Sequence, residues 1–170
     1  MKEFKPAIIF VIKFLTIYFV GNIVYGLYVE SFQQVVDPIT NWVTEQSVNI
    51  LNVVGESTET YIDKENPKVH ILHDNLAVIS VFEGCNGINV IVIFIAFLVA
   101  FGGGAKKLLW FVPLGILSIH IANLIRIVLL YFVAHYFSDY LYFTHKFLFT
   151  GFIYVWVLLL WFVWATRLCK

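Results

Sequence analysis

Long apolar runs alternate with short polar segments along most of the 170-residue chain. The runs cover residues 7–28, 87–101, 108–133 and 145–164. Runs near 20 residues suit the hydrocarbon core of a bilayer, which is about 30 Å thick and is crossed by a helix at ~1.5 Å per residue. We therefore predict an all-α integral membrane protein, a single membrane domain of residues 1–170 with about four transmembrane helices.

Residues 30–83 break this pattern, because they contain nine acidic residues and two lysines. Asp37-Pro38 is a favourable helix start. Apolar and large side chains then recur near the helical period up to Gly55, which predicts an amphipathic helix; they are Ile39, Trp42, Val43, Gln46, Ile50 and Val53. Two short apolar runs, 69–72 and 76–82, flank His73-Asp74-Asn75 and predict a short β-hairpin that leads to Cys85.

Composition limits the class of protein further. Hydrophobic residues make up 61% of the chain and charged residues 13%, outside the range of ordinary soluble domains. The formal net charge is zero, so nothing indicates a nucleic-acid partner, and membrane lipid is the expected surrounding. Two cysteines, Cys85 and Cys169, are too few for a disulfide framework, and the predicted topology separates them, so both are expected to be free thiols.

Basic residues predict the orientation of the bundle. They gather at the helix ends that an even number of spans places on one side: Lys2, Lys5, Lys106, Lys107, Arg167 and Lys170. The positive-inside rule makes that side cytoplasmic. Both termini are then expected in the cytoplasm, and residues 30–83 form an extracytoplasmic segment between the first and second spans.

This topology brings three chemically complementary residues to one depth. Cys85 precedes the second span, and His145 begins the fourth. Arg126 lies about 18 residues into the third span, or ~27 Å of helix rise, which reaches the outer boundary. We therefore predict that Cys85, Arg126 and His145 form a site at the outer membrane surface.

Their chemistry is that of acyl transfer. A thiolate is a competent nucleophile, and an imidazole can take its proton, so Cys85 and His145 can form a catalytic couple. Arg126 would stabilise the oxyanion or bind a substrate carboxylate. Asn86 and Gly87 offer backbone N–H groups at a helix start, which is expected to lower the pKa of the thiol. This interpretation requires no cofactor and no metal site.

Two other classes of function fit the same residues. A metal- or haem-binding membrane module could use His120, His135 and His145, although no two of them have the i, i+4 spacing of a helical metal site. A non-enzymatic assembly or scaffold protein would not need the thiol. Cys85→Ala separates these classes, because an enzyme would lose turnover while staying folded.

Three sequence blocks resemble the signatures of the exosortase/archaeosortase family. They are Gly84-Cys85-Asn86-Gly87-Ile88, Asn123-Leu124-Ile125-Arg126-Ile127, and His145 followed by Gly151. The resemblance covers about Val78 to Phe162. Asn86 stands where many members have serine, and the short chain is similar to a minimal subgroup of the Bacteroidetes or Flavobacteria type.

The resemblance implies a membrane-embedded cysteine transpeptidase in the bacterial inner membrane, with its active site facing the periplasm. Its partners would be secreted proteins with a C-terminal sorting signal made of a short motif, a membrane helix and a basic cluster. Cys85 would be the nucleophile, His145 the general base and acid, and Arg126 the electrostatic stabiliser. Asn86, Gly87 and Asn123 would support them.

Overall fold

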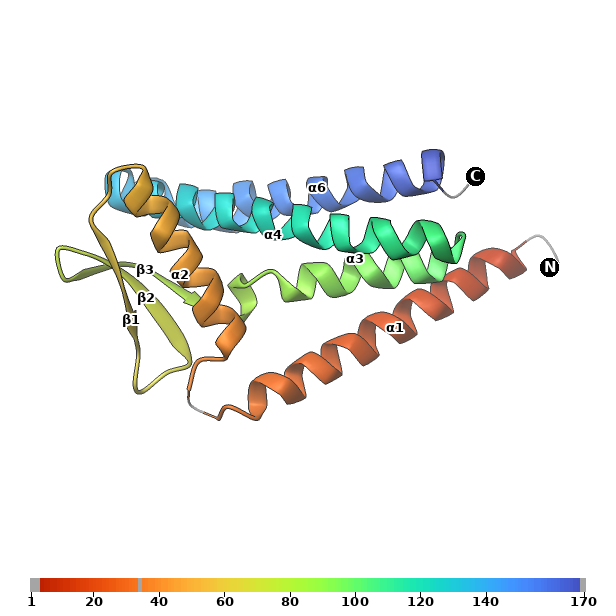
Figure 1. Cartoon of the computed structure of the whole chain (residues 1–170), viewed down its shortest axis with the longest axis horizontal. Coiled ribbons are helices and arrows are strands. Elements are labelled where there is room, and N and C mark those ends of the chain that lie inside the picture. The colour runs from red at the N-terminus through yellow and green to blue at the C-terminus, as the bar shows by residue number, and fades with distance from the viewer. Residues whose placement is uncertain (1–3, 34, 169–170) are drawn as a thin grey trace.

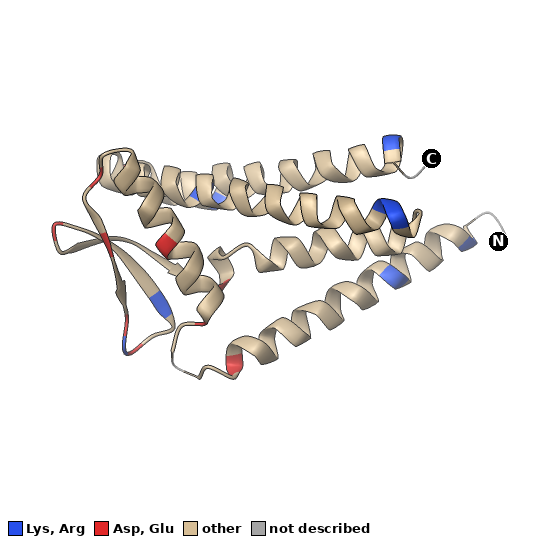
Figure 2. Cartoon of the chain, in the orientation of Figure 1, with Lys and Arg blue, Asp and Glu red and all other residues tan. Residues whose placement is uncertain are grey.

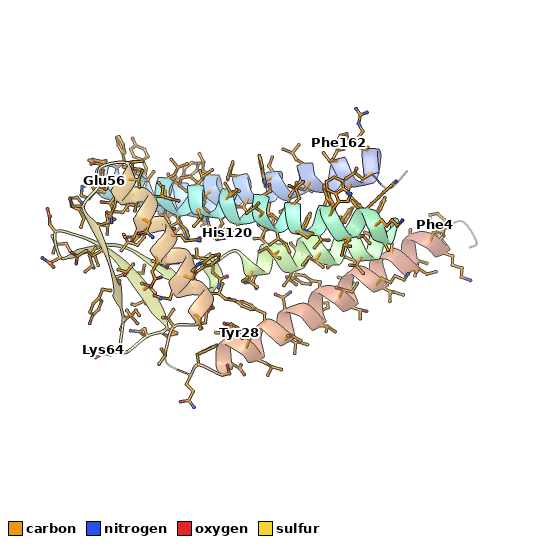
Figure 3. All side chains as sticks on the ribbon, viewed as in Figure 1. Phe4, Tyr28, Glu56, Lys64, His120 and Phe162 are labelled. Carbon is orange, nitrogen blue, oxygen red and sulfur yellow. The ribbon has the colours of Figure 1, made fainter. Side chains whose placement is uncertain are left out.

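The computed structural model describes residues 4–33 and 35–168, and it consists of a helical bundle with a small capping layer at one end (Figure 1). Both described ends of the chain, near Phe4 and Phe162, lie at the opposite end of the bundle (Figure 3). We call these the sheet end and the terminal end. Acidic residues gather toward the sheet end, and the helix ends at the terminal end carry lysines and arginines (Figure 2). Lys2, Lys170 and Cys169 lie outside the described residues, so their predicted roles remain predictions.

The bundle contains α1 (Lys5–Glu30), α3 (Ile88–Phe101), α4 (Ala105–Tyr136) and a last helical run, Ser138–Leu168. Among the described residues, three of these are long and apolar enough to cross a membrane, namely α1, α4 and the last run. The fourth, α3, is apolar but has only 14 residues. The prediction of an integral membrane helical protein is confirmed, while four spans and cytoplasmic termini remain predictions.

The last helical run is irregular in its first half. It begins with a 3-10 turn, η2 (Ser138–Tyr140), and one α-turn, α5 (Leu141–Phe143). A π-helical stretch, η3 (Thr144–Phe149), leads into α6 (Thr150–Val163), and a second π-helical stretch, η4 (Trp164–Leu168), ends it. Such π-helical segments are rare and frequently occur at functional sites.

The capping layer consists of α2 (Pro38–Val53) and an antiparallel sheet of β1 (Thr58–Ile62), β2 (Lys68–His73) and β3 (Leu76–Phe82), in the order β1-β2-β3. The predicted hairpin is β2–β3. Its turn residues Asp74 and Asn75 have φ of 49° and 64°, which suits a two-residue hairpin turn and favours these residue types. The strand β1 was not predicted, because only Thr58 of its five residues is buried and it lacks an apolar alternation.

The predicted helix in the acidic segment is α2, capped by Asp37, whose carboxylate accepts hydrogen bonds from the N–H groups of Ile39 and Thr40. Of its predicted apolar face, Val43 is buried, whereas Trp42 and Val53 are exposed. The buried face instead combines Val43, Val48 and Leu51 with three small hydroxyl residues, Thr40, Thr44 and Ser47. Thr44 and Ser47 bond carbonyls of their own helix, which allows burial but hides the face from a hydrophobicity pattern.

Two hydrophobic clusters hold the layers together. One lies inside the bundle and includes Phe94, Phe111 and Trp164. The other joins the capping layer to α4, and Cys85 belongs to it; its buried members are Val43, Val48, Leu51, Ile71, Ile79, Val81, Cys85, Leu124, Ile127 and Tyr131. The capping layer is therefore packed on the sheet end of α4.

Candidate active site around Cys85

Cys85 ends a short 3-10 turn, η1 (Glu83–Cys85), between the last strand and α3. Gly87 follows with φ of +88°, a left-handed conformation that favours glycine, and it is the N-cap of α3. A Cβ at Gly87 would lie 3.3 Å from Cγ and Nδ2 of Asn123 on α4. The turn therefore needs glycine both for its backbone conformation and for the close approach of α4.

Asn86 ties this turn to α1 and α2. It is 2% exposed, and its Nδ2 donates to the Tyr25 hydroxyl at 2.6 Å and to Thr40 Oγ1 at 2.9 Å. Its Oδ1 accepts from the N–H of Ile88 at 3.0 Å. The Thr40 hydroxyl in turn donates to Asp37. The side chains of Asn86, Tyr25, Thr40 and Asp37 thus form a polar network that holds the turn against α1 and α2.

Asn123 and Arg126 hold the turn from α4. Asn123 is 1% exposed, and its Nδ2 donates to the backbone carbonyl of Cys85 at 2.9 Å. Its Oδ1 accepts a longer hydrogen bond, 3.4 Å, from Nη1 of Arg126. Asn123 therefore fixes both the backbone of the cysteine and the position of the guanidinium.

The guanidinium of Arg126 lies beside the Cys85 thiol and interacts with it both by charge and as a hydrogen-bond partner. Among the described residues, its buried Nε–H has no hydrogen-bond partner. An unsatisfied buried N–H costs about 1–3 kcal/mol, and buried polar groups in folded proteins are seldom left in this state. The arrangement leaves a charged donor next to the thiol with capacity for a further acceptor.

Burial raises the pKa of the Cys85 thiol above its ordinary value, while the charge of Arg126 and a backbone hydrogen bond from Phe82 act in the opposite direction. The prediction that the helix start lowers this pKa is therefore not met in the resting structure. The reason is that Cys85 lies within a hydrophobic cluster, where desolvation of the thiolate outweighs the favourable groups. The resting thiol is expected to be protonated near neutral pH.

His145 lies on the π-helical stretch η3, and its ring is electrostatically coupled to Arg126. It lines an open pocket of about 450 Å³ between β3, α4 and the start of the last helical run. The other lining residues are Val78, Ile79, Ser80, Phe82, Leu130, Leu141 and Tyr142. Among the described residues, no hydrogen bond joins the His145 ring to the Cys85 thiol, and the charge of Arg126 acts on both groups.

The other two predicted histidines are not part of this site. His120 faces α2, where its Nε2 is 2.7 Å from Gln46 Oε1 and its ring stacks on Trp42 (Figure 3). His135 packs against His73, with 4.5 Å between ring centroids. About 22 Å of helix rise separates His120 from His135, so the set His120, His135 and His145 cannot share one metal or haem.

Sequence reasoning missed the partners of Asn86. The sequence indicates an interfacial aromatic residue at Tyr25 and the first turn of a helix at Thr40. No sequence pattern connects either position with Asn86. The Asp37-Pro38 signal identified the helix but not the contact of its first turn with the cysteine turn. The small polar residues on one face of α2 were the one available sign that this face meets polar groups.

A family model described as transmembrane exosortase matches residues 7–165 of the chain. No curated protein and no solved structure matches it significantly. The matched region includes all of the residues that surround the Cys85 turn.

Proposed function

Because the chain belongs to the transmembrane exosortase family, a family of cysteine-type transpeptidases, we propose that it is a membrane-embedded cysteine transpeptidase or peptidase. Its substrates would be secreted proteins with a C-terminal sorting signal, cleaved at the outer face of the bacterial inner membrane and transferred to a surface acceptor. Cys85, Arg126 and His145 would be its catalytic residues. The active site would face the periplasm.

The observation that carries this proposal is the contact between the buried Cys85 thiol and Arg126. A cysteine that served only as a small hydrophobic side chain would not need a guanidinium beside it. Burying part of an arginine costs free energy, and so does leaving its Nε–H without a partner among the described residues. A substrate carbonyl oxygen that becomes an oxyanion near Cys85 would supply the missing acceptor.

The reaction proceeds through a thioester. The Cys85 proton passes to His145, and the sulfur attacks the scissile carbonyl carbon while Arg126 stabilises the oxyanion. The C–N bond breaks, the leaving amine takes the proton from His145, and the acyl part stays on sulfur. An acceptor amine or water then attacks the thioester, its proton passes through His145, and the thiol is restored.

Proton transfer requires a rearrangement, since the resting thiol and the His145 ring are not hydrogen-bonded among the described residues. The π-helical stretch η3 is the element that can change, because a shift to regular α-helix would rotate His145. We place this step at substrate binding, which keeps the thiol protonated and unreactive until a substrate is present.

Two surfaces suit two of the three parts of a sorting signal, the short motif and the membrane helix. The strand β3 lies at the edge of the sheet, contributes residues to the His145 pocket and runs into the Cys85 turn. An extended peptide can add to such an edge through backbone hydrogen bonds. Between α4 and α6 lies an apolar groove of about 330 Å³, which includes Ile121 and Trp156 and suits the substrate's membrane helix.

The test is co-expression with a secreted reporter that carries the sorting segment of a protein encoded in the same genome. We expect the wild-type chain to remove the segment, and hydroxylamine to yield a hydroxamate at the new C-terminus by trapping the thioester. Cys85→Ala should abolish both while the protein stays in the membrane fraction. Cys169→Ala is the matched control. Undiminished processing by Cys85→Ala would refute the proposal and favour a scaffold.

A further inference from the structure

A second cluster of chemically active side chains lies at the sheet end of the bundle, apart from the Cys85 turn. It consists of Glu56 just after α2, His73 at the end of β2, and His135 in the last turn of α4. Each can offer one ligand atom, and these atoms all lie within 4.8 Å of one another. Figure 3 labels Glu56 beside the sheet end of α4.

From this arrangement we propose that Glu56, His73 and His135 bind a divalent transition-metal ion, with Zn²⁺ as the best match. Two imidazoles and one carboxylate are a ligand set that zinc takes in proteins, with a fourth position left for water or another ligand. Ligand distances near ~2.1 Å require the three groups to close toward a common point. All three are on side chains that can rotate, and His135 is exposed.

Hydrogen bonds from two tyrosines hold the ligands on the protein side. The buried hydroxyl of Tyr131 donates to Glu56 Oε2 at 3.0 Å and lies 2.9 Å from Nδ1 of His73. The hydroxyl of Tyr136 donates to Glu56 Oε1 at 3.0 Å. A carboxylate has about four acceptor positions, so each Glu56 oxygen keeps capacity for a metal. Outer partners of this kind orient metal ligands.

The rings of His73 and His135 are in contact with each other and lie close to the Glu56 carboxylate. Their centroids are 4.5 Å apart, and the Nδ1 of His73 is 3.7 Å from Glu56 Oε2. Two imidazoles that lie this close to each other and to a carboxylate can bind one cation together with it. The exposed Asp74, whose Oδ2 is 3.7 Å from Nε2 of His73, offers a carboxylate oxygen that could occupy the fourth ligand position of the metal.

A metal here would link three elements that are far apart in the sequence. Glu56 follows α2, His73 belongs to the sheet, and His135 is on α4, which also carries Arg126. The ion would fix the capping layer to the helix that positions the guanidinium. This inference concerns a site other than Cys85 and does not depend on the transpeptidase proposal, because binding is measured without substrate.

The test is a Co²⁺ titration of the purified full-length chain, followed by Zn²⁺ competition. Both cysteines are replaced by serine, and a tag without histidine is used, so that thiols and tag do not bind the metal. We expect one Co²⁺ per chain with visible d–d absorption, displaced by Zn²⁺. His73→Ala and His135→Ala should each weaken binding by at least about tenfold. His70→Ala, on the same strand, should bind as the parent does.

Lack of stoichiometric binding would overturn the proposal, as would equal binding by all variants. If a histidine variant fails to fold, X-ray absorption of the zinc-loaded wild-type chain decides the question. Two imidazole ligands and an oxygen ligand support the site, while sulfur coordination or fewer than two imidazoles contradicts it. Glu56→Gln, which keeps the shape of the side chain, should weaken binding without loss of the fold.

Discussion

Replacing Gly87 with alanine adds one methyl group to the turn that carries Cys85. The residue has φ of +88°, where an L-residue with a Cβ is disfavoured by about 1–2 kcal/mol. The new Cβ would also lie 3.3 Å from the side-chain amide of Asn123, so that amide must move by a few tenths of an ångström. Weakening its hydrogen bond to the Cys85 carbonyl costs about 1 kcal/mol more.

Gly55 separates these two contributions. It also has a left-handed backbone, with φ of +100°, but a Cβ there meets nothing within 4 Å. We therefore expect Gly55→Ala to lower the free energy of unfolding by about 1–2 kcal/mol. Gly87→Ala should lower it by about 2–3 kcal/mol, since the conformational strain is joined by the loss of the Asn123 contact.

The measurement is reversible unfolding in mixed micelles, with Asn123→Ala and the double variant completing a thermodynamic cycle. In the Asn123→Ala background the extra cost of Gly87→Ala should disappear, leaving a value like that of Gly55→Ala. Equal costs for the two glycine variants in the wild-type background would refute the reasoning, because the close approach of α4 would then contribute nothing to the turn.

Three further outcomes follow from the contacts of the site. Arg126→Met removes a positive charge that lowers the pKa of the Cys85 thiol, so this pKa should rise further. Labelling of the thiol, followed by mass spectrometry, should then require a higher pH. Asn86→Ala should lower the free energy of unfolding by about 2 kcal/mol by leaving buried groups unpaired. Asn41→Ala, which removes only an exposed hydrogen bond to Glu45, should change it by less than about 0.5 kcal/mol in the same unfolding assay. Ile121→Trp should fill the apolar groove and so reduce reporter processing, while labelling of the Cys85 thiol stays unchanged. Leu129→Trp, on the same helix but outside the groove, should leave reporter processing unchanged.

The sequence predicted the apolar helices well because membrane burial imposes a strong and simple pattern. It also predicted the hairpin before Cys85, because Asp74 and Asn75 are suited to the left-handed turn between the two strands. It did not predict the buried face of α2 or the strand β1. Both depend on tertiary packing of polar or short side chains, which leaves no hydrophobic period.

The proximity of Arg126 to Cys85 followed from counting helix rise, and the structure places the two side by side. Counting could not predict which atoms meet. His145 lies on the π-helical stretch η3, which the sequence pattern did not predict. The Glu56, His73 and His135 cluster was missed for a similar reason, because its members come from three elements whose packing is set by the sheet.

The short length of α3 has a consequence for how deep the chemistry takes place. Its 14 residues span ~21 Å, about 9 Å less than a typical hydrocarbon core. In the proposed orientation, with Lys106 and Lys107 at the cytoplasmic surface, the Cys85 turn would lie below the outer lipid boundary, or the bilayer would thin around it. The substrate helix proposed to lie in the groove between α4 and α6 would need only a similar apolar length between its basic cluster and its cleavage site. Sorting signals with a short hydrophobic segment would therefore be matched in thickness to this bundle, and longer ones would carry their cleavage site past the cysteine.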